Sequence, residues 1–407
     1  MSDFNRKEYL DNAQRLIPWG SSTCSKAPSY PPYDPAAIVR GKGCRVWDIE
    51  GREFIDFRNG LGPVTLGYAY PEVNEAIARQ LECGAVFGNP SVLEPEVAQI
   101  ISEIIPCAEM VRFLKTGGEA VAACIRLARG YTGRDHIIQI GYNGWLNSLS
   151  SGGAVLPGRL GSSSGNGIPA AISDLHHSAG WNSMDTIREI TASVDGNVAA
   201  VVVAADYGRL EEGREFYPAL RKYTKENGIL LIFDEIVTGF RISLGGVQEY
   251  FGVTPDLAVF SKGMANGMPI SVFCGSREVM KCCDRGGGVV VSSTFGGEAL
   301  SLAAAKATIN IYRRDNVIGH IWNTGKTLWS GANKIFEKHA LPVRVLGAAP
   351  CPTFTDLPDG GDIITRLMSA CYKHGISFYN VSYVNFSHKA DDIAEVLEKL
   401  EAACTEL

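Results

Sequence analysis

Two periodicities of apolar residues alternate through the middle of the chain, between about residues 71 and 275. Short apolar runs predict strands, and segments whose apolar residues recur every three or four positions predict helices. The expected strands are residues 111–114, 136–140, 198–203, 229–233, 257–260 and 270–274. The expected helices are residues 72–83, 95–105, 118–131, 184–192 and 215–227. This alternation predicts the α/β class, with a mostly parallel sheet covered by helices on both faces.

The two ends of the chain follow a different pattern. Residues 1–19 contain an amphipathic helix, and residues 38–57 are typical of a small β-meander with Gly41 and Gly43 in its turns. Residues 345–407 mix short strands with helices and predict a small α+β domain. We expect the meander to join that domain, so that the sheet domain is inserted between the two ends of the chain.

Three regions are therefore expected along the sequence. Residues 1–65 form an N-terminal segment and part of the small domain, residues 66–300 the large domain, and residues 301–407 the C-terminal small domain. Inside the large domain, residues 146–169 are rich in Gly and Ser and predict a long surface loop.

Composition excludes several classes of function. The net charge is −6 and Lys and Arg are scattered among the 407 residues, so nucleic acid is not expected as a partner. No run of about 20 apolar residues predicts a membrane span, and the polar N-terminus lacks the apolar core of a signal peptide. The eleven cysteines include no Cys-x-x-Cys pair, which favours reduced thiols and a cytoplasmic protein. His176 and His177 lack a cluster of further ligands, so we predict no metal site.

Lys262 and Asp234 are the first candidates for chemistry. Asp234 directly follows an apolar run that predicts a buried strand, and Lys262 comes two residues after another such run. If both strands are parallel, their carboxyl ends face one crevice, where ligands of open α/β sheets bind. An amine that can form a Schiff base and a carboxylate that can pair with a pyridinium nitrogen are the groups that pyridoxal phosphate requires. Taken separately, Lys262 could be a solvated surface charge and Asp234 a helix N-cap.

Other candidates surround this pair. Gly117 and Gly118 stand between a strand and a helix, where free N–H groups and the helix dipole suit a phosphate, although a simple tight turn is the alternative. Tyr142 follows a strand and could stack on a planar ring or simply fill the core. Residues 292–297, which include Thr294, form a second possible anion site or a flexible loop, and Glu235 is expected to be solvent-facing or structural.

Together these residues resemble the class III pyridoxal-phosphate-dependent aminotransferases of fold type I. The resemblance covers nearly the whole chain and is most specific in residues 232–241, 254–256 and 261–267. Within the class, the chain is similar to the glutamate-1-semialdehyde aminomutase branch and to relatives that aminate sugar-like or other specialised carbonyl compounds. The resemblance implies a large domain with a mostly parallel central sheet and a small α+β domain built from both chain ends.

The resemblance also implies a role for each matching residue. Lys262 would form the Schiff base with pyridoxal 5′-phosphate and later transfer protons, and Asp234 would pair with the pyridinium nitrogen. Gly117 and Gly118 would bind the phosphate. Tyr142 and Ile236 would contact the two faces of the ring. Thr294 would reach the phosphate of the neighbouring subunit's cofactor, which implies a homodimer with shared active sites.

The chain departs from the family pattern at three places. Asn143 replaces the usual His after the stacking aromatic residue, Ala204-Ala205 replaces a Glu-Pro pair, and Lys115-Thr116 replaces the Asn-Ser of many relatives. These changes leave cofactor binding intact but put the usual handling of the substrate in doubt.

We therefore expect a transaminase that moves an amino group from an amino-acid donor to an aldehyde or ketone. The alternatives are an aminomutase or epimerase that uses the same cofactor, and a non-catalytic relative of the same fold. A nicotinamide-dependent dehydrogenase is not expected, because no Gly-x-Gly-x-x-Gly motif with a following acidic residue comes after an early strand.

Overall fold

The computed structural model describes residues 5–146, 167–358 and 360–407 of the chain. It contains two compact units. The central unit is Glu72–Ile318, and the terminal unit combines Met1–Pro71 with Gly319–Leu407. The domain boundaries expected after residues 65 and 300 stay predictions.

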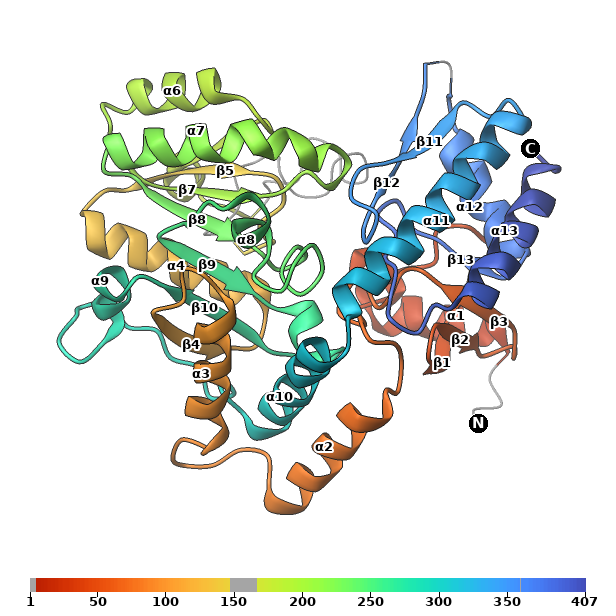
Figure 1. Cartoon of the computed structure of the whole chain (residues 1–407), viewed down its shortest axis with the longest axis horizontal. Helices are drawn as coiled ribbons and strands as arrows, with labels where there is room; N and C mark the ends of the chain where they lie inside the picture. The colour runs from red at the N-terminus through yellow and green to blue at the C-terminus, as the bar shows by residue number, and fades with distance from the viewer. Residues whose placement is uncertain (1–4, 147–166, 359) are drawn as a thin grey trace. The chain divides into compact units, whose positions relative to one another are not determined.

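The central unit is built on a seven-stranded sheet with the strand order β4-β10-β9-β8-β7-β5-β6 (Figure 1). Strand β10 pairs antiparallel with β4 and β9, and the remaining pairs are parallel. The strands are β4 (Met110–Leu114), β5 (His136–Ile140), β6 (His176–Ala179), β7 (Val198–Ala204), β8 (Leu230–Asp234), β9 (Leu257–Phe260) and β10 (Ser271–Gly275). The expected α/β class with a mostly parallel sheet is confirmed.

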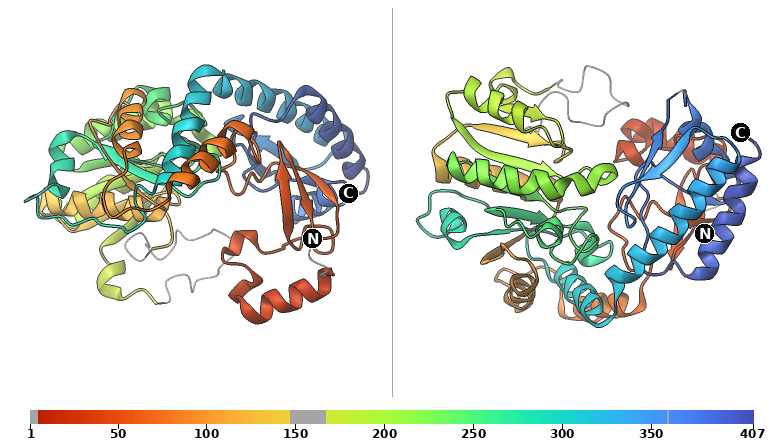
Figure 2. Two further views of the ribbon diagram at one scale, coloured as in Figure 1. Left: turned by 90° about the horizontal axis from the view of Figure 1, so that it is seen from below. Right: turned by 45° about the horizontal axis from the view of Figure 1, so that its top comes forward.

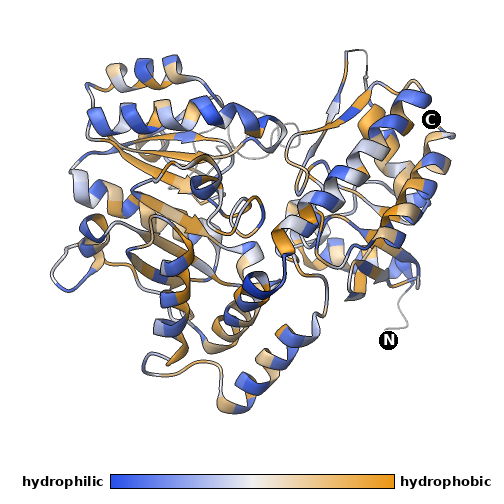
Figure 3. Cartoon of the chain, in the orientation of Figure 1, coloured by the Kyte–Doolittle hydropathy of each residue, from blue (hydrophilic) through white to orange (hydrophobic). Residues whose placement is uncertain are grey.

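Helices cover both faces of this sheet (Figures 1 and 2). Helix α4 packs in one apolar cluster with Val202, Ile232 and Val259, whereas Tyr217 of α7 contacts Phe233, which points to the opposite face. The strands are correspondingly apolar, and the outer sides of α6 and α7 carry the hydrophilic residues (Figure 3). The helices are α2 (Pro71–Cys83), α3 (Leu93–Ile104), α4 (Gly117–Thr132), α5 (Ala170–Ser173), α6 (Met184–Ser193), α7 (Gly213–Glu226), α8 (Val247–Phe251), α9 (Arg277–Met280) and α10 (Ala299–Arg314).

One strand of this sheet was not expected from the sequence. His176 and His177 belong to β6, which pairs in parallel with β5 at the edge of the sheet. Their polar side chains hide the strand pattern because an edge strand does not need to be apolar on both faces. Residues 147–166 of the predicted Gly/Ser-rich loop lie outside the described residues.

The terminal unit joins the two ends of the chain through a sheet with the order β1-β2-β3-β13. Strand β13 pairs in parallel with β3, with Ile376 opposite Ile55, so the meander does join the C-terminal part. The strands are β1 (Ile38–Lys42), β2 (Arg45–Asp48), β3 (Glu53–Asp56), β13 (Ile376–Ser377) and the separate pair β11 (Val343–Leu346) and β12 (Thr353–Asp356). The helices are α1 (Arg6–Leu16), α11 (Val317–Lys338), α12 (Ile363–Lys373) and α13 (Ala390–Cys404).

The two glycines of the meander have different roles. Gly43 has a φ of +60° and lies in the turn, as expected. Gly41 does not lie in a turn: it is inside β1, opposite Val46. A methyl group added there would lie 2.6 Å from the ring of Tyr68, so a close approach of two segments is what excludes a side chain.

Candidate active site

The candidate site lies where parallel strands of the central unit end. Asp234 is the last residue of β8, and Lys262 begins the 3-10 helix η5 (Lys262–Ala265) two residues after β9. Because β8 and β9 are neighbouring parallel strands, both residues are at the same edge of the sheet. The positive charge of Lys262 acts on Asp234 and favours its ionised form.

Asp234 is a buried carboxylate with few partners. Its side chain is 7% exposed. The backbone N–H of Ile236 donates to Oδ1 at 3.1 Å, and the Asn143 amide donates to Oδ2 at 3.3 Å. Burial raises the pKa of Asp234 to about 6, although these two donors and the Lys262 charge act in the opposite direction. A cationic group placed beside a buried carboxyl with a raised pKa stabilises its charged form.

Lys262 is held in an unusual backbone conformation. Its φ is +40°, which is uncommon for a residue with a side chain, and the next three residues, Gly263 to Ala265, are buried. The hydroxyl of Tyr312 donates to the carbonyl of Phe240 at 2.9 Å and also lies 3.4 Å from the carbonyl of Gly263 in this turn. Backbone strain of this kind collects at functional sites, so the alternative of a solvated surface lysine is not favoured.

The first turn of α4 provides backbone donors. The N-cap Thr116 and Glu119 form a capping box, in which the Thr116 N–H donates to Glu119 Oε2 at 2.8 Å. Within the described residues, neither the Gly117 nor the Gly118 N–H donates a hydrogen bond. A methyl group on Gly117 would lie 2.4 Å from Cδ1 of Ile236, so this turn packs directly against the segment that follows Asp234. Open N–H groups at the start of a long helix suit an anion.

Tyr142 and Asn143 follow β5 but differ in burial. Tyr142 is 51% exposed, whereas Asn143 is 2% exposed. Asn143 Oδ1 is buried and accepts no hydrogen bond from the described residues. Sequence reasoning noted Asn143 only as a departure from the family and missed its contact with Asp234, for which the pattern offers no signal.

Two departures from the family pattern lie beside Asp234: Asn143 donates to it, and Ala204 is opposite it in the β7–β8 pairing. Gly141 has a φ of +76°, and a methyl group there would lie 2.9 Å from the carbonyl oxygen of Ala204. It would also lie 3.2 Å from Cβ of Ala204, which is opposite Asp234 in the β7–β8 pairing. The small side chain at the end of β7 therefore leaves room for the loop that brings Asn143 to Asp234.

Glu235 is adjacent to Asp234 but is directed elsewhere. It is fully buried, so the solvent-facing alternative is wrong and the structural one holds. Its carboxylate accepts the N–H groups of Val247 at 2.9 Å and Gln248 at 3.0 Å, together with the Thr238 hydroxyl. Burial raises the pKa of Glu235 to about 7 in spite of these three donors.

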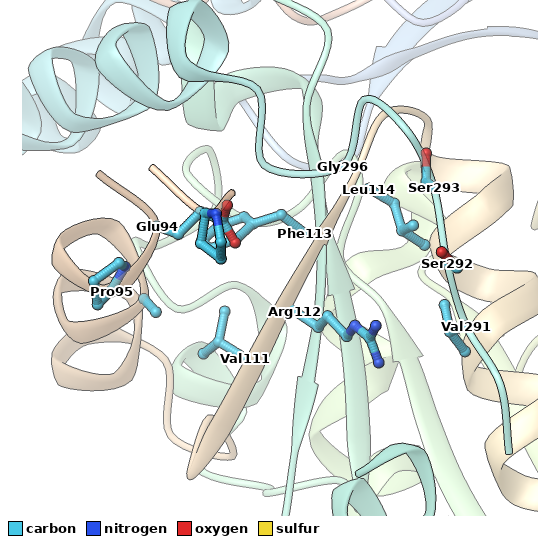
Figure 4. A pocket seen from close by; sticks show the side chains of 12 residues that line it. Glu94, Pro95, Val111, Arg112, Phe113, Leu114, Val291, Ser292, Ser293 and Gly296 are labelled. Atoms are coloured by element: carbon cyan, nitrogen blue, oxygen red, sulfur yellow. The ribbon is translucent and has the colours of Figure 1, made fainter. Parts of the chain in front are cut away.

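The structure does not bring the segment around Thr294 to the Asp234–Lys262 pair. Thr294 is exposed and lines a hollow of about 160 Å³ together with residues 85–91. Ser292 and Ser293 line another hollow, of about 410 Å³, beside the edge strand β4 (Figure 4). Neither hollow includes Asp234 or Lys262 among its lining residues. A second anion site in this segment therefore stays a prediction.

The residues at the sheet edge fit pyridoxal phosphate. The buried Asp234 carboxylate offers an acceptor to a protonated ring nitrogen, and the open N–H groups of α4 offer donors to a phosphate. The Asn143 oxygen is a buried acceptor that a ligand group could satisfy. Lys262 supplies the amine on a neighbouring strand end.

Comparisons with known proteins agree with this arrangement. The family model for aminotransferase class III matches residues 27–404. A curated relative, glutamate-1-semialdehyde 2,1-aminomutase of Archaeoglobus fulgidus, is 33% identical, with 97% of this chain and 98% of that protein covered.

Two solved structures are similar over their full lengths. The pyridoxal-phosphate internal aldimine form of FumI from a Sphingopyxis species has a TM-score of 0.89 at 26% identity, covering 98% of this chain and 96% of that one. An omega-transaminase from Sphaerobacter thermophilus has a TM-score of 0.87 at 25% identity, covering 99% of this chain and 98% of that one.

Among the described residues, no helix is long and apolar enough to cross a membrane. The chain belongs to the class III aminotransferases and is a pyridoxal-phosphate-dependent transaminase.

Proposed function

We propose that this transaminase moves an amino group from an amino-acid donor to an aldehyde or ketone of a sugar-like or specialised metabolite. The observation that carries the proposal is the position of Lys262 and the buried Asp234 after neighbouring parallel strands, where the lysine charge favours the ionised carboxylate. A purely structural lysine and acid would not need the strained backbone of Lys262 or the open donors of α4 beside them.

Each residue of the site has a proposed task. Lys262 Nζ would hold the cofactor aldehyde covalently and then remove and return the proton at the substrate carbon. Asp234 would keep the ring nitrogen protonated, and Gly117 and Gly118 would bind the phosphate. Tyr142 and Ile236 would flank the ring. The bound cofactor supplies an electron sink that stabilises negative charge developing at the substrate carbon.

The end of β7 supports a carbonyl acceptor that differs from those of the usual family members. Ala204 and Ala205 are buried and carry no charge where the family usually has Glu-Pro. Without that glutamate, the last residue of β7 offers no carboxylate to a substrate group, and the carboxylate of Asp206, two residues further on, caps the next 3-10 helix and pairs with Arg209. We therefore expect selectivity to come from other walls of the pocket.

An aminomutase is the second candidate, and a specific observation favours it. Curated relatives that cover nearly the whole chain carry the name glutamate-1-semialdehyde 2,1-aminomutase. The two reactions differ in their need for a partner: an aminomutase turns over a single substrate, whereas a transaminase needs a separate amino donor and carbonyl acceptor. Turnover of one compound alone, with no keto acid added, would select the aminomutase.

We also propose a cytoplasmic homodimer in which Thr294 reaches the neighbouring subunit's cofactor. The support is a group of exposed apolar side chains near this segment: Val86 and Phe87 line a hollow together with Thr294, and Phe295 follows Thr294 in the sequence. A monomer rarely leaves so many large apolar side chains exposed in one part of its surface. Light scattering of the purified protein would test the dimer, and Phe295→Asp should convert it to monomers.

The test of the proposed function is Lys262→Ala, compared with Lys222→Ala, which removes an exposed lysine of α7. We expect borohydride treatment of the cofactor-loaded protein to leave a peptide containing residue 262 heavier by the mass of the reduced cofactor, and Lys262→Ala to abolish this label. Turnover with a panel of amino donors and sugar aldehydes should fall by at least about 10³-fold in Lys262→Ala. A label that persists in Lys262→Ala would refute the assignment.

A further inference from the structure

Lys115 departs from the family pattern, and the proposed function gives it no task. It directly follows β4, and the next residue, Thr116, is the N-cap of α4. We propose that Lys115 is a positioning residue, which holds the first turn of α4 in the place where the cofactor phosphate binds. This role rests on the proposed binding of the phosphate by Gly117 and Gly118.

Three acceptors from the protein use the ammonium group of Lys115 completely. Its Nζ donates to the carbonyl of Pro269 at 2.7 Å, to Glu298 Oε1 at 2.6 Å and to the Ser301 hydroxyl at 3.0 Å. A lysine ammonium has three hydrogens to donate, so this set of partners is full. Lys115 therefore acts on a bound phosphate through the backbone that it holds in place and not through a direct contact.

The acceptors of Lys115 are themselves fixed by further hydrogen bonds. Glu298 is the N-cap of α10, where its two carboxylate oxygens accept the N–H groups of Leu300 at 2.8 Å and Ser301 at 2.9 Å. The hydroxyl of the fully buried Ser301 donates to the carbonyl of Pro269 at 3.1 Å. Lys115 thus connects the end of β4 to the start of α10 and to the segment before β10, which are already joined to each other.

The pair formed by Lys115 and Glu298 is mostly shielded from water. The side chains are 18% and 9% exposed. Burial would raise the pKa of Glu298, but the hydrogen bonds from Lys115 and Ser301 hold it below its usual value. Removing one partner would leave a mostly buried charge without its counter-charge. The asparagine of many relatives is shorter than lysine and carries no charge, so it could not form this pair.

The first turn of α4 depends on Lys115 more than the turn η5 does. In η5, the hydroxyl of Ser261 donates to the carbonyl of Ile270 at 2.7 Å and closes the turn independently. At the start of α4, the hydroxyl of the buried Ser271 donates to the carbonyl of Thr116 at 2.8 Å, next to the residue that Lys115 anchors. Loss of Lys115 should therefore loosen the phosphate turn and leave the turn that carries the Schiff-base amine in place.

The experiment separates the phosphate from the rest of the cofactor. Fluorescence titration of the full-length protein, freed of cofactor, would use pyridoxal 5′-phosphate and pyridoxal, which differ by the phosphate. A change in the ratio of the two affinities between variants therefore reports the phosphate contact. Lys115→Met loses charge-assisted hydrogen bonds, so it should weaken pyridoxal 5′-phosphate by about tenfold and pyridoxal by less than about twofold. Lys115→Arg keeps the charge and should restore most of the affinity.

A matched control is available on α10. Lys306→Met removes a lysine whose side chain is 40% exposed and pairs with Glu96, and it should leave both affinities unchanged. Glu298→Gln keeps an acceptor for the cap but removes the charge. It should weaken pyridoxal 5′-phosphate by a smaller factor, and it remains informative if Lys115→Met fails to fold.

Two results would overturn the assigned role of Lys115. One is equal weakening of both compounds in Lys115→Met, which would indicate a general structural role. The other is an unchanged ratio of affinities in both Lys115→Met and Glu298→Gln. If the parent protein itself binds pyridoxal as tightly as pyridoxal 5′-phosphate, the proposed phosphate site on α4 is refuted, and the role of Lys115 with it.

Discussion

Asp234 and Glu235 are neighbours in the sequence, and both are buried with raised pKa values, yet their surroundings differ. Glu235 accepts three hydrogen bonds from groups of its own loop and the first turn of α8. Among the described residues, Asp234 accepts one backbone and one amide donor, and besides burial the charge of Lys262 acts on it. The full set of hydrogen-bond donors around Glu235 indicates a structural role. The smaller set of donors around Asp234 indicates a carboxylate that can bind a cationic group of a ligand.

Asp234→Asn should have the largest effect on turnover and is the strongest test of the difference between Asp234 and Glu235. We expect turnover to fall by roughly 10²-fold or more, because a neutral amide no longer keeps the ring nitrogen protonated. The folded protein without cofactor should at the same time be as stable as the parent, or more stable, at pH 8. The raised pKa means that the folded state holds a proton up to about pH 6, so stability is lost as pH rises from about 4 to 6.

Thermal unfolding at pH 5 and pH 8 checks this prediction. The parent should lose stability between these two values relative to Asp234→Asn. A variant that is strongly destabilised at both pH values would show that Asp234 is mainly structural, and the contrast with Glu235 would disappear.

Glu235→Ala should show the opposite behaviour. It leaves the N–H groups of Val247 and Gln248 buried without an acceptor, which should cost about 2–4 kcal/mol of unfolding free energy. Cofactor affinity of the fraction that remains folded should change little. Denaturant titration, together with fluorescence titration of the cofactor, measures the two quantities. A stable Glu235→Ala that loses cofactor would reverse the assignment.

Gly117→Ala tests how closely α4 packs against the segment after Asp234. The added methyl would lie 2.4 Å from Ile236 Cδ1, so the helix start or Ile236 must move. We expect a cost of roughly 1–3 kcal/mol in cofactor binding or in stability. Gly180→Ala is the matched control, because a methyl there would meet only Cβ of Ser183, at an ordinary contact distance of 3.8 Å. Equal behaviour of the two variants would contradict the packing argument.

The smallest effect is expected from Asn143→Leu. The Asn143 amide stabilises the charged form of Asp234, so its removal should move the pKa of Asp234 further above about 6. The acid side of the pH profile of cofactor affinity should therefore shift upward by roughly 0.5–1 pH unit. Fluorescence titrations between pH 5 and 8 measure the shift, and Asn143→His, which restores a donor, should reverse it. A shift to lower pH would contradict the assigned contact.

The sequence was sufficient to place Lys262, Asp234 and Gly117, because each follows or ends a strongly apolar run. The ends of parallel strands and the starts of the following helices meet at one edge of the sheet by topology alone. The contact between Asn143 and Asp234 could not be predicted, since it depends on how Gly141 packs on Ala204. The burial of Glu235 depends likewise on α8, 12 residues further along, folding back over it. The strand β6 was missed because its position at the edge of the sheet is known only once the sheet is assembled. The role of Gly41 was missed because its close approach to the Tyr68 ring also depends on the folded structure.

The pairing of β3 with β13 has a consequence for synthesis on the ribosome. Ile55 leaves the exit tunnel long before Ile376, which is its partner in the sheet. The continuous stretch Glu72–Ile318 can therefore fold while the early strands still lack their neighbour. A premature stop codon anywhere before Ile376 would leave β3 with an unpaired edge, so truncated chains should aggregate or be degraded rather than persist as partly active fragments.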